Sequence, residues 1–242
     1  ENKPVKVKIT ETVELNVYPK SVKENDEVLY FTIVENNEKY LTLIYEGTET
    51  SVVKTFDGTI EELPSEKVYL KKCVQTTANR KALQKIFPFT NAKTIGLENS
   101  FGFGDRLGVA NPAHIRAVIQ TDFIPVLSQQ SIRELTRTKR TPAEVMDAAV
   151  WAVFQEGLDT GFGADADHLK TTEDIDLMVD NGFRMFTFDP SEYVNNDADT
   201  MNEEALDKAI EKINWTGLEA SFDMLATEYV NKEYNLPLEV SI

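Results

Sequence analysis

The sequence has a single cysteine, no long apolar run and few basic residues in its second half. Cys73 alone cannot form an internal disulfide, which is typical of a protein in a reducing cytoplasm. No apolar run approaches the roughly 20 residues that span a bilayer, and no signal peptide is recognisable at the N-terminus. The 25 basic against 41 acidic side chains argue against a nucleic-acid partner, because affinity for phosphates depends on clustered lysine and arginine. We therefore expect a cytoplasmic protein with no nucleic-acid and no membrane partner.

The composition is that of a folded, acidic protein. With 242 residues, of which 41% are hydrophobic, the chain can form one large domain or a small domain beside a larger one. Its net charge of −16 is uneven, since residues 1–140 contain 18 acidic and 20 basic side chains and residues 141–242 contain 23 and 5. We interpret the acidic second part as a solvated surface rather than as a charge-driven binding site.

The pattern of residues 1–76 predicts a small β-rich N-terminal domain. Apolar side chains alternate with mostly polar ones between Val5 and Val17, as in a half-buried strand. Further β-rich runs occupy residues 28–34, 40–45 and 67–74. The pair Asn36-Asn37 is a turn signal of the kind that joins antiparallel strands. Because this region has no cluster of catalytic side chains, we expect it to serve in packing or in oligomer formation.

In residues 77–242 strands alternate with helices, which predicts parallel strands with helical crossovers. The expected strands are residues 92–97, 123–127, 162–167 and 184–188. Four β/α units are half of an eight-unit barrel. We therefore predict an α/β fold in which TIM-barrel-like (β/α) units follow the β-rich domain and form about half a barrel. This catalytic domain would be incomplete at its C-terminus, and an open, doubly wound sheet is the alternative.

Signals for helix starts support this order of elements. Asn111-Pro112 offers an N-cap residue followed by proline at the first helical position. Thr141 and Glu144 form a capping box, and Gly157 is placed to end the helix that this box begins. Further helices are expected over residues 172–180, from a second capping box at Thr200 and Glu203, and over residues 217–231.

Polar side chains follow each of the four expected strands. They are, in strand order, Asp105 and Arg106; Gln129, Gln130, Arg133 and Glu134; Asp165, Asp167 and His168; and Asp189. In parallel α/β folds the residues that carry out chemistry lie just after the C-terminal ends of the strands. These groups are therefore expected to converge on one candidate site.

Three of these residues have a specific chemical interpretation. His168 suits a divalent metal such as Zn, Mn, Co or Ni, and a capped surface histidine explains it equally well. Glu134 suits a general acid/base or a metal carboxylate, with an ordinary salt bridge to a neighbouring base as the alternative. Arg106 suits a carboxylate, in a glycine-rich loop that matches neither the dinucleotide nor the phosphate-loop motif, and a tight structural turn explains this loop equally well. A catalytic metal needs about three protein ligands, and the sequence offers only His168 with carboxylates.

Five longer motifs occur in order between residues 90 and 194. They are residues 96–116 (GLENSFGFGDRLGVANPAHIR), 129–134 (QQSIRE), 151–157 (WAVFQEG), 161–168 (GFGADADH) and 186–191 (FTFDPS). Together they resemble the corresponding segments of the tagaturonate/fructuronate epimerase family. The resemblance does not extend to residues 1–75, and it is weak in residues 195–242.

The resemblance implies a metal-dependent hexuronate epimerase with a barrel-like core, which interconverts D-tagaturonate and D-fructuronate. It implies that His168 is a metal ligand and Glu134 an acid/base residue, and Asp165, Asp167 and Asp189 lie where a cation would be held. The substrate-side residues would be Asp105, Arg106, Gln130 and Asp189. The inverted carbon is not adjacent to the ketone, so we expect retro-aldol cleavage and re-addition, with a metal-held enediolate. The small-molecule partner is then a sugar acid.

Members of this family are longer than this chain and carry further metal histidines in their C-terminal part. We therefore expect the chain to correspond to an N-terminal half, whose partner is the missing C-terminal half or a second copy in a homo-oligomer. Two other functions stay open. One is a metal-dependent sugar aldolase or lyase, and the other is a non-catalytic sugar-acid-binding or partner-subunit domain.

Overall fold

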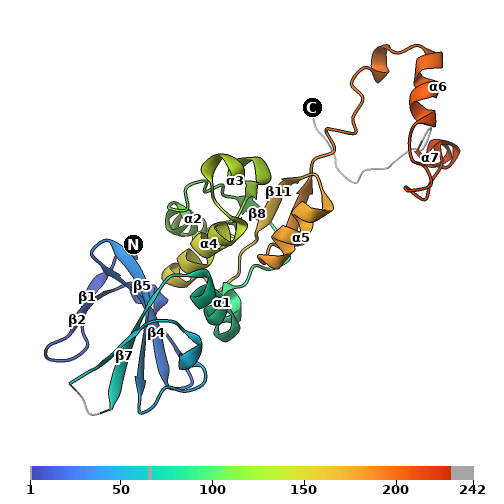
Figure 1. Ribbon diagram of the computed structural model, residues 1–242. Helices are drawn as coiled ribbons and strands as arrows, with labels where there is room; N and C mark the ends of the chain where they lie inside the picture. Colours follow the sequence, from blue (N-terminus) through green and yellow to red (C-terminus); the bar gives the residue numbers. More distant parts are fainter. Residues whose placement is uncertain (1, 65–66, 230–242) are drawn as a thin grey trace. The chain divides into compact units, whose positions relative to one another are not determined.

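The computed structural model describes residues 2–64 and 67–229 (Figure 1). The chain forms two compact units, Glu1–Asp189 and Pro190–Ile242. The first unit therefore includes both the β-rich region and the parallel strands, so that the expected boundary after residue 76 stays a prediction. Within the described ranges, no helix is both long enough and apolar enough to cross a membrane.

The first unit begins with an antiparallel sheet that has seven strands among the described residues. They are β1 (Val5–Lys8), β2 (Glu14–Val17), β3 (Lys23–Asn25), β4 (Val28–Glu35), β5 (Glu38–Glu46), β6 (Thr59–Glu62) and β7 (Val68–Val74). The strand order is β1-β2-β4-β5-β7-β6, with β3 paired to β4. Asn36 and Asn37 join β4 to β5 with φ values of 51° and 65°. Two consecutive left-handed residues are what a tight hairpin turn requires, so this predicted turn is confirmed.

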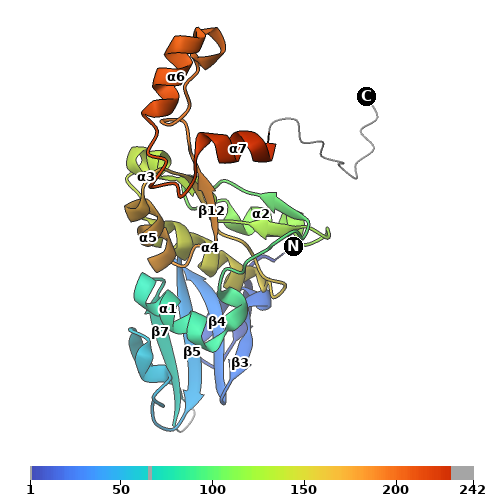
Figure 2. The same ribbon diagram turned by 90° about the vertical axis from the view of Figure 1, so that its right-hand side faces the viewer.

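An aromatic core lies between this sheet and two helices, α1 (Thr77–Ile86) and α4 (Pro142–Glu156) (Figure 2). Its buried side chains include Tyr30, Leu41, Leu43, Phe56, Leu83, Phe87, Trp151 and Phe154. The rings of Tyr30 and Phe87 meet edge to face, with centroids 5.2 Å apart. Three short 3-10 helices, η1 (Pro19–Ser21), η2 (Val53–Thr55) and η3 (Pro88–Thr90), lie in the connections. Burial of large apolar side chains is the main stabilising contribution to this region.

Parallel strands form the rest of the first unit. They are β8 (Ser100–Gly102), β9 (Ile124–Val126), β10 (Gln130–Ser131), β11 (Asp165–Leu169) and β12 (Met185–Phe188). β8 pairs with β9, and β11 pairs with β10 on one side and β12 on the other. A parallel bridge from Val126 to Gly163 connects the two groups of strands. The predicted α/β character is therefore confirmed in its coarse form.

Helices cover these strands, as the alternating pattern predicted. They are α2 (Asn111–Val118), α3 (Ile132–Thr138), α4 and α5 (Thr172–Asp180). The Thr141 hydroxyl accepts the N–H of Glu144 at 3.2 Å, and the Glu144 carboxylate accepts the N–H of Thr141 at 2.7 Å. The capping box at α4 is thus confirmed, and Gly157 ends this helix in the left-handed conformation. The bounds of α5 are also those expected.

Two of the expected strands were wrong in their bounds. Of residues 92–97 only Ala92 pairs, through an isolated bridge, because Gly96 has a φ of 63° and the chain turns there. Pairing resumes in β8, which leads directly to Asp105. The expected strand 162–167 was displaced as well, since β11 extends to Leu169 and includes His168.

The start of α2 also differs from the prediction. The N-cap residue is Ala110, which has no side-chain cap, and Asn111 already lies in the helix. The Asp105 carboxylate accepts the N–H groups of Ala110 at 2.7 Å and of Asn111 at 3.0 Å instead. A carboxylate from a preceding loop can serve several amides at a helix N-terminus, whereas an asparagine side chain offers one acceptor.

The second unit contains η4 (Ala198–Thr200), α6 (Glu203–Glu211) and α7 (Phe222–Tyr229). The capping box predicted at Thr200 was wrong, because Thr200 ends η4 and its hydroxyl donates to the Asp197 carbonyl. Asn202 caps α6 by accepting the N–H of Ala205 at 2.9 Å. The end of the helix expected over residues 217–231 lies partly outside the described residues.

Candidate functional site

The C-terminal ends of β10, β11 and β12 surround a hollow of about 330 Å³, which we call the C-terminal mouth. It is lined by Ser131, Ile132, Arg133, His168, Lys170, Asp174 and Asp189. The structure therefore brings three of the residues expected at the strand ends, Arg133, His168 and Asp189, to the same hollow. Glu134 follows Arg133 in the first turn of α3 and is not among the lining residues, and its carboxylate is paired with Arg106.

His168 occupies a break in the regular pairing of β11. Its φ is 56°, a left-handed value within a strand, and the β11–β12 register shifts between Ala166 and Leu169. Adjacent residues of a regular strand point to opposite faces, whereas a bulge re-aims them. The Nδ1 atom of His168 accordingly lies 2.7 Å from Oδ1 of Asp167.

This contact has a chemical consequence for metal binding. A histidine that binds a metal usually donates its other ring N–H to a carboxylate, which fixes the orientation of the ring. If Nδ1 donates to Asp167, Nε2 is the nitrogen of His168 that can face a cation. The described part of the chain contains no group of three histidine, cysteine or acidic side chains that could hold a metal ion. The donors fit a divalent metal by type, and they fall short of the usual number.

Glu134 is held at both of its carboxylate oxygens. Arg106 donates from Nε to Oε1 at 2.6 Å, and its Nη2 contacts the same oxygen. Ser131 and Glu134 form a capping box at the start of α3, with the Ser131 N–H donating to Oε2 at 3.3 Å and the Glu134 N–H to the hydroxyl at 3.2 Å. A salt bridge therefore exists, and its partner comes from the glycine-rich loop after β8 rather than from α3 itself.

Asp105 is buried and organises the loop that carries Arg106. Its Oδ1 accepts the N–H groups of Gly108 at 2.8 Å and Val109 at 3.2 Å, and its Oδ2 accepts the two that cap α2. Four backbone amides thus converge on one carboxylate. Charge-assisted bonds of this kind are stronger than neutral ones, so Asp105 fixes the conformation of this loop. Its expected contact with substrate stays a prediction.

Gln130 is buried and accepts a hydrogen bond from Arg140. Arg140 donates from Nη1 to the side-chain oxygen of Gln130 at 3.2 Å and to the Asp105 carbonyl at 2.8 Å. Its Nη2 donates to the Glu144 carbonyl at 3.2 Å. Among the described residues, the amide nitrogen of Gln130 has no hydrogen-bond partner. Arg140 therefore joins the loop after β8, the start of β10 and the first turn of α4.

Asp165 is the most deeply buried of the carboxylates that were expected near a cation. It is buried at the start of β11, where the Thr187 hydroxyl donates to it at 3.0 Å and the Gln129 amide at 3.4 Å. Burial raises the pKa of Asp165, and these two hydrogen bonds act in the opposite direction. The sequence placed Asp165 among the strand-end residues, and it contained no signal that separates a buried aspartate from its neighbour Asp167.

Comparisons with known proteins identify the family of this chain. A family model described as UxaE, tagaturonate epimerase, matches residues 18–242. A tagaturonate/fructuronate epimerase of Thermotoga maritima is 41% identical over 180 residues, which are 74% of this chain and 36% of that protein.

Solved structures give the same family. Two crystal structures of the fructuronate-tagaturonate epimerase UxaE from Cohnella laeviribosi, one with glycerol and one native, match with a TM-score of 0.76 at 37% and 36% identity. Each match covers 91% of this chain, and 42% or 43% of the solved chain. The chain thus spans about two fifths of the length of the relatives that it matches. From this agreement of sequence and structure, we conclude that the chain belongs to the tagaturonate epimerase family.

Proposed function

We propose that this chain carries part of the active site of a hexuronate epimerase that interconverts D-tagaturonate and D-fructuronate. The observation that carries the proposal is the C-terminal mouth, where His168 and Asp189 line one hollow together with Ser131, the N-cap of the helix that carries Glu134. Family membership supports the same reaction, since the relatives are named for it. A cytoplasmic location follows from this metabolic role and agrees with a free, buried Cys73.

The proposed architecture is about half of a TIM-like barrel that begins after the antiparallel sheet. Its support is the parallel pairing of β8 with β9 and of β10 with β11 and β12, with helices between the strands. A half-barrel leaves parallel edges unpaired, which is unfavourable for an isolated sheet. The remaining strands would therefore come from chain outside the described residues or from a partner subunit.

In the proposed reaction Glu134 acts as the acid/base residue. Removal of the proton from the hydroxyl on the inverted carbon allows the bond to the carbon beside the ketone to break, which leaves an aldehyde and an enediolate. Re-addition to the opposite face of the aldehyde restores the bond with inverted configuration, and the new alkoxide takes back a proton. Glu134 can take part only when Arg106 releases it, so we propose that the substrate carboxylate competes for Arg106.

The other expected residues have supporting positions. Asp105 holds the loop that presents Arg106, Gln130 contacts Arg140, and Asp189 lines the hollow. Substrate hydroxyl groups would bond to Asp189 and to the unpartnered amide of Gln130.

We further propose that His168 and Asp167 are the contribution of this chain to a divalent-metal site. Stabilisation of negative charge on enediolate oxygens is the chemistry that such a cation supplies. Because the described residues do not complete a ligand set, we assign no step to the metal. The missing ligands would come with the rest of the barrel.

The test is an epimerase assay on D-tagaturonate, using both this chain and the whole product of its reading frame. After removal of metals with a chelator, D-fructuronate formation is followed with and without added Mn²⁺ or Zn²⁺. We expect Glu134→Gln to lower kcat by about 100-fold or more. Glu173→Gln, which changes an exposed glutamate in the first turn of α5, is the matched control and should leave kcat unchanged. Absence of epimerisation by both proteins with either metal would contradict the proposal.

A second measurement tests the bond cleavage. Turnover in the presence of a labelled three-carbon ketose should place the label in the product, because the cleaved fragment exchanges before re-addition. Turnover without any label incorporation, and without a trappable aldehyde, would exclude retro-aldol cleavage while leaving the epimerase assignment intact.

A further inference from the structure

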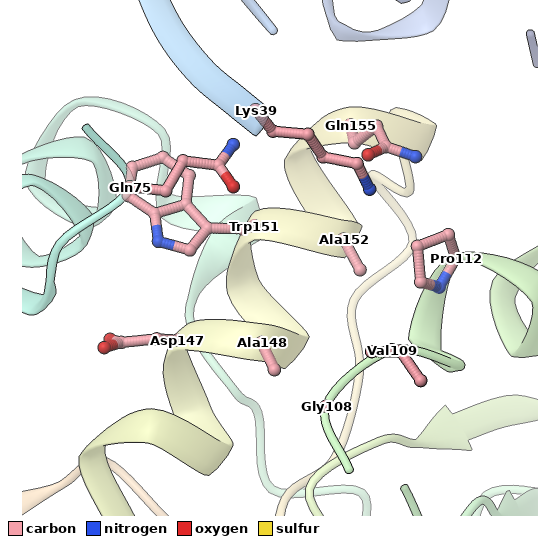
Figure 3. A pocket seen from close by; sticks show the side chains of 10 residues that line it. All are labelled: Lys39, Gln75, Gly108, Val109, Pro112, Asp147, Ala148, Trp151, Ala152 and Gln155. Carbon is pink, nitrogen blue, oxygen red and sulfur yellow. The ribbon is translucent and has the colours of Figure 1, made fainter. Parts of the chain in front are cut away.

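A second hollow, of about 350 Å³, lies between the antiparallel sheet, the loop before α2, and α4 (Figure 3). We call it the Lys39 hollow. Its lining residues are Lys39, Gln75, Gly108, Val109, Pro112, Asp147, Ala148, Trp151, Ala152 and Gln155. None of the residues expected at the C-terminal mouth is among them, and all belong to the first unit.

The floor of the Lys39 hollow is apolar and belongs to α4. Ala148 and Ala152 are four residues apart, so they share one face of the helix. Figure 3 shows this face turned toward Val109 and Pro112 from the α2 side of the hollow. Two alanines on a helix leave room where larger side chains would fill the space. The hollow therefore has a small apolar surface on which a short carbon chain can lie.

The polar side of the hollow has one cation, Lys39. Figure 3 shows its side chain extending from β5 along α4 toward Gln155. Among the described residues it has no ion pair, and its ammonium lies 5.5 Å from the centre of the Tyr18 ring. The acid whose charge acts on it, Glu156, is already bound by Arg116 through two hydrogen bonds of 2.7 and 2.9 Å. Burial lowers the pKa of Lys39, so a negative charge in the hollow would favour its protonated form.

Two buried hydrogen-bond donors of residues that line this hollow have no acceptor among the described residues. In the described part of the chain, Gln75 Nε2 and Trp151 Nε1 are buried and have no partner. Asp147, the carboxylate of the lining, already accepts from Thr77 and from Arg80. Buried donors without acceptors cost free energy, which a ligand with acceptor oxygens would recover.

We propose that the Lys39 hollow binds a small organic carboxylate, with its oxygens on Lys39 and the Gln75 amide and its carbon chain on Ala148 and Ala152. The charge of Lys39 favours an anion, and the unpartnered amide nitrogen of Gln75 favours an oxygen acceptor. The alanine floor favours a ligand with an apolar part over a bare ion. This site is separate from the C-terminal mouth, and the proposal does not depend on the reaction there.

The test uses the indole N–H signals of the ¹⁵N-labelled chain in a titration with butyrate. The sequence contains two tryptophans, Trp151 and Trp215, and a Trp215→Phe variant assigns the signals. We expect a saturable shift of the Trp151 signal. The Trp215 signal should stay in place, because its N–H donates to the Ile210 carbonyl in the second unit. Butyramide, which has nearly the same shape and no charge, should cause no saturable shift.

Two variants separate charge from shape. Lys39→Gln should weaken butyrate binding about tenfold, the size of one charge-assisted hydrogen bond, whereas Lys54→Gln at an exposed lysine should not change it. Ala148→Met should abolish the shift by filling the floor while Lys39 is retained. The proposal is overturned by the absence of a saturable shift, by an equal shift with butyramide, or by unchanged binding in both Lys39→Gln and Ala148→Met.

Discussion

The antiparallel sheet and the parallel strands of the first unit use backbone pairing differently. β4, β5 and β7 have eight, nine and seven residues, and they contribute large apolar side chains to an aromatic core. β8, β9 and β10 have only three, three and two residues, and polar side chains that bond across elements follow them. Long paired strands give stability, whereas short strands place many strand ends, and therefore many loops, close together. The comparison separates a supporting region from a region suited to chemistry.

α4 nevertheless belongs to both regions. Its Trp151 and Phe154 pack into the core of the antiparallel sheet, whereas Met146, Val150 and Val153 pack under the parallel strands. A helix that is buried on opposite sides couples the stability of the two regions. The two regions therefore have different roles but should unfold together as one cooperative unit. Substitutions in each region can test this.

The largest effect is expected from a truncation in the shared helix. Phe154→Ala removes a fully buried ring between α4 and the antiparallel sheet, and should lower the free energy of unfolding by about 3–5 kcal/mol. Urea unfolding should follow one transition by both far-UV circular dichroism and amide signals of the parallel strands. Phe123→Ala, at a half-exposed ring, is the control and should cost far less. Two separate transitions in the unchanged chain would show that the regions are independent.

The next largest effect is expected at Asp105, on the side of the candidate site. Asp105→Ala leaves four amides without their acceptor and should lower the free energy of unfolding by about 3 kcal/mol. Hydrogen exchange should speed up at Gly108 to Asn111 more than elsewhere. Asp122→Ala, at an exposed position, serves as the control. Unchanged hydrogen exchange at these amides in the Asp105 variant would mean that the loop keeps its conformation without the Asp105 carboxylate.

A smaller effect is expected from Asp165, on the pH dependence of the free energy of unfolding. Burial raises the folded-state pKa of Asp165 above the unfolded value, so the folded chain keeps this proton to higher pH than the unfolded chain does. The stability that Asp165 contributes is therefore present below the unfolded pKa of about 3.9 and is lost as the pH rises through the folded pKa. Asp165→Asn should raise stability at neutral pH by under about 2 kcal/mol and flatten this part of the pH profile.

Unfolding curves between pH 3 and pH 8 would check this expectation. Asp159→Asn, at an exposed aspartate, should leave the shape of the profile as it is. A profile for Asp165→Asn that runs parallel to that of the unchanged chain would contradict the direction of the pKa shift.

The smallest effect is expected in the exposed part of the supporting sheet. Lys6 and Glu14 form an ion pair of 3.2 Å between β1 and β2, and their side chains are 78% and 52% exposed. Glu14→Gln should therefore change the free energy of unfolding by less than about 0.5 kcal/mol. A double-mutant cycle with Lys6→Gln measures the coupling, and a value above about 1 kcal/mol would give this pair a larger role than its exposure allows.

Much of the fold follows from patterns that are local in the sequence. The turn at Asn36-Asn37, the capping box at Thr141 and the bounds of α5 were predicted because each depends on a few neighbouring residues. The strand bounds near residues 92 and 162 were not, because Gly96 and His168 take left-handed conformations that no periodicity reveals. Turns and helix caps can be predicted from neighbouring residues, whereas a bend or bulge in a strand depends on tertiary contacts.

The position of the candidate site could be predicted from the sequence, whereas the hydrogen bonds and ion pairs within it could not. Strand-end reasoning brought His168 and Asp189 to one hollow. It missed α3, although Ser131 and Glu134 have the same capping-box spacing as Thr141 and Glu144. The pairing of Arg106 with Glu134, 28 residues apart, depends on how the loop after β8 folds back. Such long-range contacts need the tertiary structure.

Cys73 has a practical consequence for labelling chemistry. Its side chain is buried and free, and burial raises its pKa to about 12, so its reactive thiolate form is scarce at neutral pH. A cysteine introduced on the surface would react with maleimide dyes or spin labels in preference to Cys73. The native chain thus already provides a nearly silent background for single-site conjugation, and no cysteine has to be removed first.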